Sequence, residues 1–154
     1  EGVCVEGIRI IELPGARMVS SGSQDLDGFD RWWSAVDRGR KDRFFPRDFM
    51  WFDPEAGSLV WYYALPDGVS DTGGYDVVDF PGGLYAAAVS RDQDDRDGER
   101  VYAAVKEWVE NSGCFAVDEG PGRRTMFHVV TSDAAFRAMG YRQLDLYVPI
   151  RVIV

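Results

Sequence analysis

The sequence predicts an α+β fold in which a β-α-β-β module occurs twice. Three observations carry this prediction: a repeated Pro-Gly turn, a helical pattern after each copy of the turn, and two strand-like runs after each helix. Two such modules form an antiparallel sheet with both helices on one face, and we expect a ligand cleft between halves related by a pseudo-twofold axis. The 154 residues fit a single domain, 1–154, with an internal repeat that covers roughly 3–66 and 75–152.

The repeated turn is the clearest mark of duplication. The segment LPGARMV at 13–19 recurs as FPGGLYA at 80–86, an offset of 67 residues. Each copy follows an apolar-rich run, at 3–11 and at 75–78. Apolar runs that end at Pro and Gly indicate strands bounded by turns.

A helical pattern follows each turn and opens at Asp27-Gly28 in the first half and at Asp97-Gly98 in the second. In both patterns the apolar residues recur at intervals of three and four, which is typical of one buried helix face. These residues are Phe29, Trp32, Trp33 and Val36 in the first half, and Val101, Tyr102, Val105, Trp108 and Val109 in the second. We expect Gly39 and Gly113 to end the two helices.

Two strand-like runs follow each helix. In the first half they are 44–52 and 59–65, joined by a turn that contains Pro and Gly. In the second half they are 125–131 and 143–152, and the segment between them predicts a short helix closed by Gly140.

Alternation in the last strand separates two rows of side chains. We expect the aliphatic row to pack against the helices, and its members are Leu144, Leu146, Val148 and Ile150. Asp145 and Tyr147 then point to the opposite face, where the cleft is expected.

Composition excludes several classes of function. With 17 basic and 26 acidic residues the net charge is −9, so direct binding of nucleic acid by this chain is not expected. No apolar run has the length of a membrane helix, and no leader is seen. Two cysteines, Cys4 and Cys114, and one histidine, His128, make neither a disulfide framework nor a metal cluster. We therefore predict no metal and no cofactor, reduced thiols in a cytosolic protein, and a structural role for His128.

The aromatic content is unusually high. Aromatic residues make up 14% of the chain, and four of the five tryptophans fall between 32 and 61. Each large side chain taken alone favours the core, but the set exceeds what short hairpins bury on one face. We expect at least two of four residues to line the cleft: Trp33, Trp51, Trp61 and Tyr63. In the strand that holds His128, Phe127 is the better candidate for ligand contact.

These motifs resemble a known family. The Pro-Gly turns that enter strands, the helix end at 108–113 and the closing run DLYVPI at 145–150 are similar to the GyrI-like small-molecule-binding domain, also called the bacterial transcription activator effector-binding domain. The segments FPRDFMW at 45–51 and VWYY at 60–63 resemble the subgroup attached to AraC-type regulators. The resemblance implies a duplicated β-α-β-β fold, a small organic ligand in the cleft, and DNA contact only through a separate helix-turn-helix region.

The resemblance also implies a role for Asp145. The family commonly carries a glutamate four residues before the proline of its last strand, and multidrug-sensing members use it to meet cationic ligands. Asp145 holds that position with a side chain one methylene shorter. Aromatic faces beside a bound cation contribute roughly 0.5–2 kcal/mol each. From the residues alone, Asp145 instead accepts hydrogen bonds within the sheet or pairs with an arginine such as Arg142.

We predict that this is the effector-binding domain of a cytoplasmic AraC-type regulator, without catalytic residues, that senses an aromatic or cationic ligand through Asp145, Tyr147 and the aromatic set. The alternative is a stand-alone hydrolase or binder of reactive small molecules, in which Asp145 and Tyr147 supply general acid/base catalysis. A third hypothesis is an inhibitor that binds a protein through its acidic surface. The start at Glu1 without methionine suggests a piece of a longer chain, and the partners considered include a second copy in a homodimer.

Overall fold

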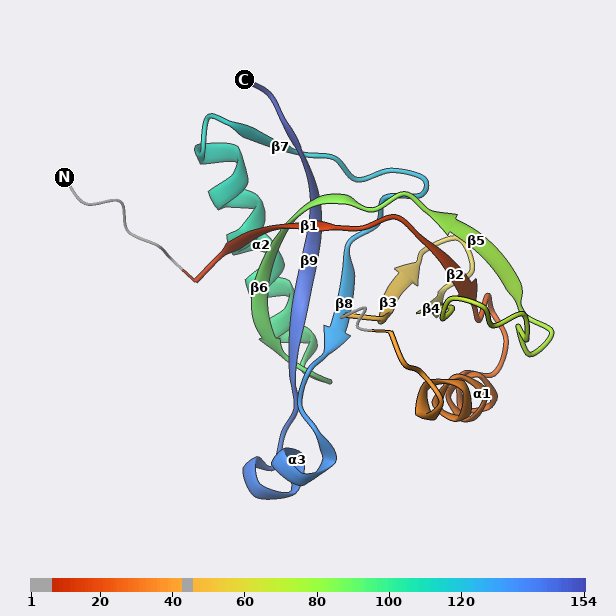
Figure 1. Ribbon diagram of the computed structural model, residues 1–154. Helices are drawn as coiled ribbons and strands as arrows, with labels where there is room; N and C mark the ends of the chain where they lie inside the picture. Colours follow the sequence, from red (N-terminus) through yellow and green to blue (C-terminus); the bar gives the residue numbers. More distant parts are fainter. Residues whose placement is uncertain (1–6, 43–45) are drawn as a thin grey trace. The chain divides into compact units, whose positions relative to one another are not determined.

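The computed structural model describes residues 7–42 and 46–154 and divides into two compact units (Figure 1). Unit 1 combines the described residues up to Leu13 with Gly82–Val154, and unit 2 is Pro14–Pro81. Cys4 and the first residues of the strands predicted at 3–11 and 44–52 lie outside the described residues.

Unit 2 is a four-stranded antiparallel sheet with one helix on one face. Its strand order is β3-β4-β2-β5. The Asp25 side chain begins α1 by accepting hydrogen bonds from the amides of Asp27 and Gly28, and Gly39 ends the helix as predicted. The elements are β2 (Ala16–Ser20), α1 (Leu26–Arg38), β3 (Asp48–Asp53), β4 (Ser58–Ala64) and β5 (Asp76–Phe80).

Unit 1 has the antiparallel order β1-β6-β9-β8, and β7 pairs with the last residues of β9. Helix α2 lies along β6 and β9, and α3 lies in the connection between β8 and β9 (Figure 1). The predicted Gly140 cap closes α3. The elements are β1 (Arg9–Leu13), β6 (Gly83–Arg91), α2 (Asp95–Asn111), β7 (Phe115–Val117), β8 (Met126–Val129), α3 (Asp133–Met139) and β9 (Gln143–Val152).

The two units repeat one topology, which confirms the α+β fold with a duplicated β-α-β-β module. The order β3-β4-β2-β5 in unit 2 corresponds to β8-β9-β6-β1 in unit 1. The registers agree at the offset found in the sequence, because Leu13 pairs with Gly83 and Phe80 pairs with Ala16. That residues 1–154 form a single domain stays a prediction.

The Pro-Gly turns connect strands that do not pair with each other. Strand β1 precedes β2 but pairs with β6, and β5 precedes β6 but pairs with β2. A two-residue hairpin needs a positive φ at its first loop position, and the fixed negative φ of Pro14 or Pro81 opposes that conformation. Each Pro-Gly pair therefore carries the chain onward from one unit to the other.

The core of unit 1 lies between α2 and the sheet. The predicted aliphatic row of β9 packs there against the buried face of α2, as expected from strand alternation. The buried residues of this cluster are Ala86, Val101, Val105, Val109, Leu144, Leu146, Val148 and Ile150. The sequence did not predict β7, whose three residues are too few for a periodic signal.

Asp97, in the first turn of α2, binds the end of β6 and makes stability depend on pH. Arg100, the Arg91 amide and the Ser90 hydroxyl bond its carboxylate and lower the pKa of Asp97 from 3.8 to about 2. A depressed native pKa stabilises the fold above pH 4, and this contribution is lost as the pH falls from about 4 through 2. We expect Asp97→Asn to destabilise the protein at pH 7 but not at pH 2.

Urea unfolding of both proteins between pH 7 and 2 measures this difference. Asp95→Asn, in the same first turn but without those three contacts, is the matched control. An Asp97→Asn curve that stays parallel to wild type over the whole range would contradict the assignment.

Candidate functional site

The face of the unit 1 sheet opposite α2 carries the polar residues of the last strand. Register partners in neighbouring strands point to the same face. One row across the sheet runs from β1 to β8 through Arg9, Ala87, Tyr147 and Met126. The next row contains Val89, Asp145 and His128.

Asp145 is held by two contacts on one carboxylate oxygen. The Tyr147 hydroxyl donates to Oδ2 at 3.2 Å, and Nη2 of Arg9 lies 3.2 Å from the same atom. The Arg9 side chain reaches Asp145 across β6, where the small Ala87 lies between them. The side chain of Asp145 is 14% exposed and that of Arg9 is 64% exposed. The cation beside Asp145 is therefore Arg9.

Arg142, which the sequence offered as a partner for Asp145, is engaged elsewhere. Its guanidinium donates to the Thr131 carbonyl at 2.9 Å and to Asp133 at 2.6 Å. These bonds fix the connection that carries α3 and leave Asp145 to Arg9.

Tyr147 is a hydrogen-bond donor at neutral pH. Burial raises the pKa of its hydroxyl, and the neighbouring Asp145 charge raises it further. Its ring packs edge-on against the buried Tyr85, with centroids 6.3 Å apart. Tyr147 therefore orients the Asp145 carboxylate through its one hydroxyl proton, whereas a role as general base is disfavoured.

Exposure changes along this face. Tyr85, Tyr147, Met126 and His128 are buried. Val89, the register partner of Asp145, is 56% exposed. Asp145 thus lies at the boundary between a buried aromatic floor and solvent, where a charged ligand can reach it.

The second module has no equivalent charge pair. By strand order and register, Tyr62 corresponds to Tyr147, but Val60 stands in place of Asp145 and Asp76 in place of Arg9. Trp51 corresponds to His128. Since unit 2 builds the same sheet with a valine at this position, the fold does not require the carboxylate.

Three of the predicted ligand residues lie in the core of unit 2. Trp33, Trp61 and Tyr63 pack with Phe29 and Val19 between α1 and the sheet. The Trp33 ring stacks on Tyr63 at 5.2 Å and meets Trp61 edge-on at 5.5 Å. These contacts account for much of the aromatic surplus seen in the sequence.

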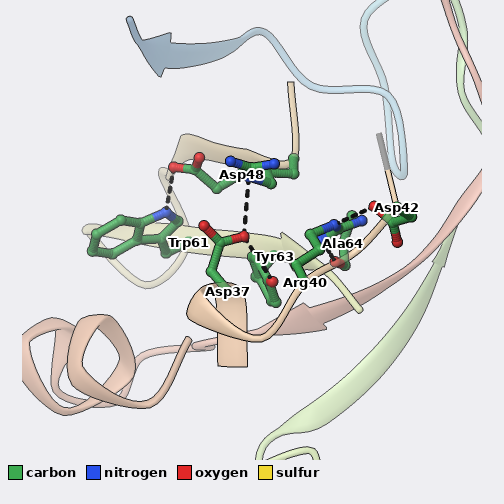
Figure 2. Close-up of polar contacts among 8 residues, drawn as sticks. Asp37, Arg40, Asp42, Asp48, Trp61, Tyr63 and Ala64 are labelled. Carbon is green, nitrogen blue, oxygen red and sulfur yellow. Dashed lines mark hydrogen bonds and ion pairs between the residues drawn. The ribbon is translucent and has the colours of Figure 1, made fainter. Parts of the chain in front are cut away.

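Polar contacts hold the rim of this core (Figure 2). Trp61 Nε1 donates to Asp48 at 3.1 Å, and the Tyr63 hydroxyl donates to Asp37 at 3.1 Å. Arg40 donates to Asp42 and to the Ala64 carbonyl. Burial raises the pKa of Tyr63 to about 12. The polar ends of Trp61 and Tyr63 are thus engaged within unit 2.

Trp51 lies on the sheet face of unit 2 that points away from α1, whereas Phe127 lies on the sheet face of unit 1 that packs against α2. The Trp51 ring meets Tyr62 at 5.9 Å. Phe127 pairs with Leu146 and packs against the α2 core. Phe127 therefore does not share a face with Asp145, and His128 does.

Unit 2 contains a surface hollow of about 620 Å³. Its lining includes Pro14, Gly15, Pro81, Arg40 and Asp42. None of the predicted ligand residues contributes to it, and neither does Arg9.

Two features are absent from the described residues, 7–42 and 46–154. No helix in these ranges has the length and apolarity needed to cross a membrane. Within the same ranges, no group of three or more His, Cys, Asp or Glu side chains is placed to hold a metal ion.

Sequence reasoning missed Arg9 and His128 as members of this face. Arg9 reaches Asp145 through a pairing between distant strands, β1 and β6, for which the local pattern carries no signal. For His128, the signal was strand alternation: once β8 pairs with β9, the register partner of Asp145 shares its face.

Solved structures with this fold are known, although no family model and no curated protein matches the sequence. A hydrolase from Listeria innocua matches with a TM-score of 0.66 and 14% identity, over 94% of this chain and 91% of that one. The EcmrR C-terminal domain matches with a TM-score of 0.66 and 12% identity, over 95% and 98%. The fold is shared with both.

A third similar structure contains a ligand. SAV2435, bound to tetraphenylphosphonium, matches with a TM-score of 0.53 and 10% identity, over 94% of this chain and 93% of that one. EcmrR is also known in a complex with DNA, where the shared fold covers 57% of its chain. At these identities the likeness concerns the fold alone.

Proposed function

We propose that the chain is a GyrI-like effector-binding domain that takes an aromatic or cationic organic molecule at Asp145. The observation that carries the proposal is this half-buried carboxylate, which the second module replaces with Val60. A carboxylate beside a buried aromatic floor costs free energy unless a cation pairs with it. Tyr147 donates its hydroxyl to this carboxylate, and the buried Tyr85 ring packs edge-on against Tyr147.

The proposed parent is a cytoplasmic AraC-type regulator in which a separate helix-turn-helix region contacts DNA. The net charge of −9 disfavours DNA contact by this chain. The shared fold covers only part of the EcmrR chain in its DNA complex, which supports separate regions for ligand binding and DNA binding. A homodimer and multidrug sensing belong to the same proposal.

Tetraphenylphosphonium is the probe for this proposal. We expect it to bind the wild-type chain, and we expect Asp145→Asn to weaken binding by about tenfold or more, because the amide keeps the shape but loses the charge. Isothermal titration measures Kd for both proteins. Asp76→Asn removes a charge from the equivalent edge strand of unit 2 and is the matched control.

The outcome separates charge recognition from simple apolar binding. A neutral triaryl phosphine oxide should bind wild type and Asp145→Asn equally. Equal binding of the cation to both proteins would remove Asp145 from the proposed site.

A hydrolase of reactive small molecules is the second candidate. The hydrogen bond between Tyr147 and Asp145 favours it, since it pairs an acid with an aromatic hydroxyl. Incubation with strained and ester-bearing compounds, followed by mass spectrometry, tests turnover. Product that forms with wild type and not with Asp145→Asn would support the enzyme, and no product across a broad panel would count against it.

A further inference from the structure

We infer that Arg9 is a displaceable counter-ion of Asp145 that makes the site select bulky aromatic cations over small hydrated ones. This inference rests on the proposed function. It starts from the charge state of the pair: Arg9 and Asp145 neutralise each other at 3.2 Å before any ligand arrives. A cation that pairs with Oδ2 of Asp145 must first displace this guanidinium.

Displacement is cheap on the Arg9 side. Its side chain is 64% exposed and lies on β1, the edge strand of unit 1, so the released guanidinium returns to water. Ion pairs with such exposure contribute little to stability. Strand β1 stays in place through its backbone pairing with β6 from Arg9 to Leu13, which does not depend on the Arg9 side chain.

Displacement is costly on the Asp145 side. At 14% exposure this carboxylate has lost much of its hydration, so its pairing with Arg9 is stronger than that of a fully exposed ion pair. An incoming cation takes the place of Arg9, so its electrostatic gain is reduced by the loss of this ion pair. The apolar contact that the ligand adds supplies the rest of the driving force for binding.

Only ligands with aromatic or apolar surface gain from this exchange. The neighbours of Asp145 on its face are Val89, His128 and Tyr147. Tyr147 and His128 are buried, and the exposed Val89 offers apolar contact to an aryl group. A small ammonium ion that remains fully hydrated has nothing to offset the loss of Arg9. The ion pair between Arg9 and Asp145 therefore makes the site select bulky aromatic cations over small hydrated ones.

The second module supports a specific role for Arg9. At the equivalent edge position unit 2 has Asp76, the opposite charge, on a strand with the same register. An edge strand of this module therefore does not require an arginine. Arg9 is matched to Asp145, which unit 2 lacks.

Titration of four proteins tests the inference: wild type, Arg9→Gln, Arg9→Lys and Arg96→Gln. Arg96 is exposed on α2, so Arg96→Gln takes the net charge from −9 to −10 as Arg9→Gln does, but α2 packs on the face of the unit 1 sheet opposite Asp145. For tetraphenylphosphonium we expect Arg9→Gln to bind about three- to tenfold more tightly than wild type. Arg9→Lys and Arg96→Gln should stay within twofold of wild type.

A small cation provides the second readout. Methylammonium, a small and strongly hydrated cation, should bind Arg9→Gln measurably and wild type at least about fivefold more weakly, because only the variant leaves Asp145 without a counter-ion. Thermal unfolding without ligand confirms that each variant is folded.

The outcomes distinguish this inference from the proposed function. Unchanged or weaker binding of tetraphenylphosphonium by Arg9→Gln, with the Asp145→Asn effect intact, would overturn the role of Arg9 and leave the cation site standing. Absence of binding by every protein, wild type included, would overturn both. Tighter binding by Arg9→Gln and Arg96→Gln alike would show that the change in net charge alone causes the effect. It would also overturn the role of Arg9 in selecting ligands.

Discussion

Replacement of Arg123 by methionine is expected to lower the free energy of unfolding by about 3 kcal/mol. The guanidinium of Arg123 donates to the carbonyls of Gly82 at 2.7 Å, Leu84 at 2.8 Å and Ile150 at 3.1 Å. It thereby ties the start of β6 to the end of β9. Methionine keeps much of the side-chain volume but leaves these half-buried carbonyls without a donor.

Arg123 also supports the candidate site. Its guanidinium lies 4.9 Å from the centre of the Tyr85 ring, which packs edge-on against Tyr147. We therefore expect Arg123→Met to weaken ligand binding at Asp145 as well. Arg137→Met, at an exposed position on α3, is the control for loss of a positive charge.

Gly83 sharpens this prediction, since a side chain there collides with Arg123. A Cβ at Gly83 would lie 2.2 Å from Nη1 of Arg123, and the residue has a φ of +115°. Gly83→Ala should cost about 3 kcal/mol in wild type, but only the roughly 1–2 kcal/mol of backbone strain when Arg123 is methionine. Urea denaturation of the two single variants and the double variant measures the coupling.

Additive effects of the two substitutions would contradict this packing. Gly98→Ala is the matched glycine control, because a Cβ there meets nothing within 4 Å inside α2. We expect it to stabilise the protein by roughly 0.5–1 kcal/mol, as alanine does in a helix.

The sequence predicted best what depends on short-range periodicity. The spacing of Val101, Val105 and Val109 marked the buried face of α2, and alternation in β9 placed Asp145 and Tyr147 opposite the aliphatic row. The offset of 67 residues reappears in the strand registers. Each of these signals is contained in one segment or in a direct repeat.

The register of a strand with its partner, and so the face to which each side chain points, could not be predicted from the sequence. Phe127 and His128 are neighbours in β8, so a shift of one residue exchanges their faces. Pairing with β9 puts Phe127 against α2 and His128 on the face of Asp145. The same uncertainty affected Trp61, because alternation in β4 does not say which row the helix covers.

The sequence also did not predict that β1 pairs with β6 and β5 with β2. A run followed by Pro-Gly and a second run looks locally like a hairpin, yet Pro14 prevents the hairpin turn and β1 pairs with β6. Arg9 and Asp145 are 136 residues apart and meet only through this topology.

The high aromatic content predicted that several aromatic side chains contact a ligand. Many of them instead pack around Phe29 in the core of unit 2. Phe29 is fully buried, and its ring lies 4.9 Å from Tyr75, 5.6 Å from Trp32 and 6.0 Å from Trp61. We expect Phe29→Ala to cost about 3–5 kcal/mol, since it removes the centre of the cluster between α1 and the sheet.

Phe52→Ala is the matched control for Phe29→Ala. Phe52 is an aromatic residue on β3 with 57% of its surface exposed, and we expect a change within about 0.5 kcal/mol. Thermal and urea unfolding, followed by tryptophan fluorescence, measure both variants, because the indoles of Trp32 and Trp61 report directly on this cluster. A cost below about 1 kcal/mol for Phe29→Ala would contradict a packed aromatic core. Such a result would favour ligand contact for Trp33, Trp61 and Tyr63, because their packing would then contribute little to the stability of the fold.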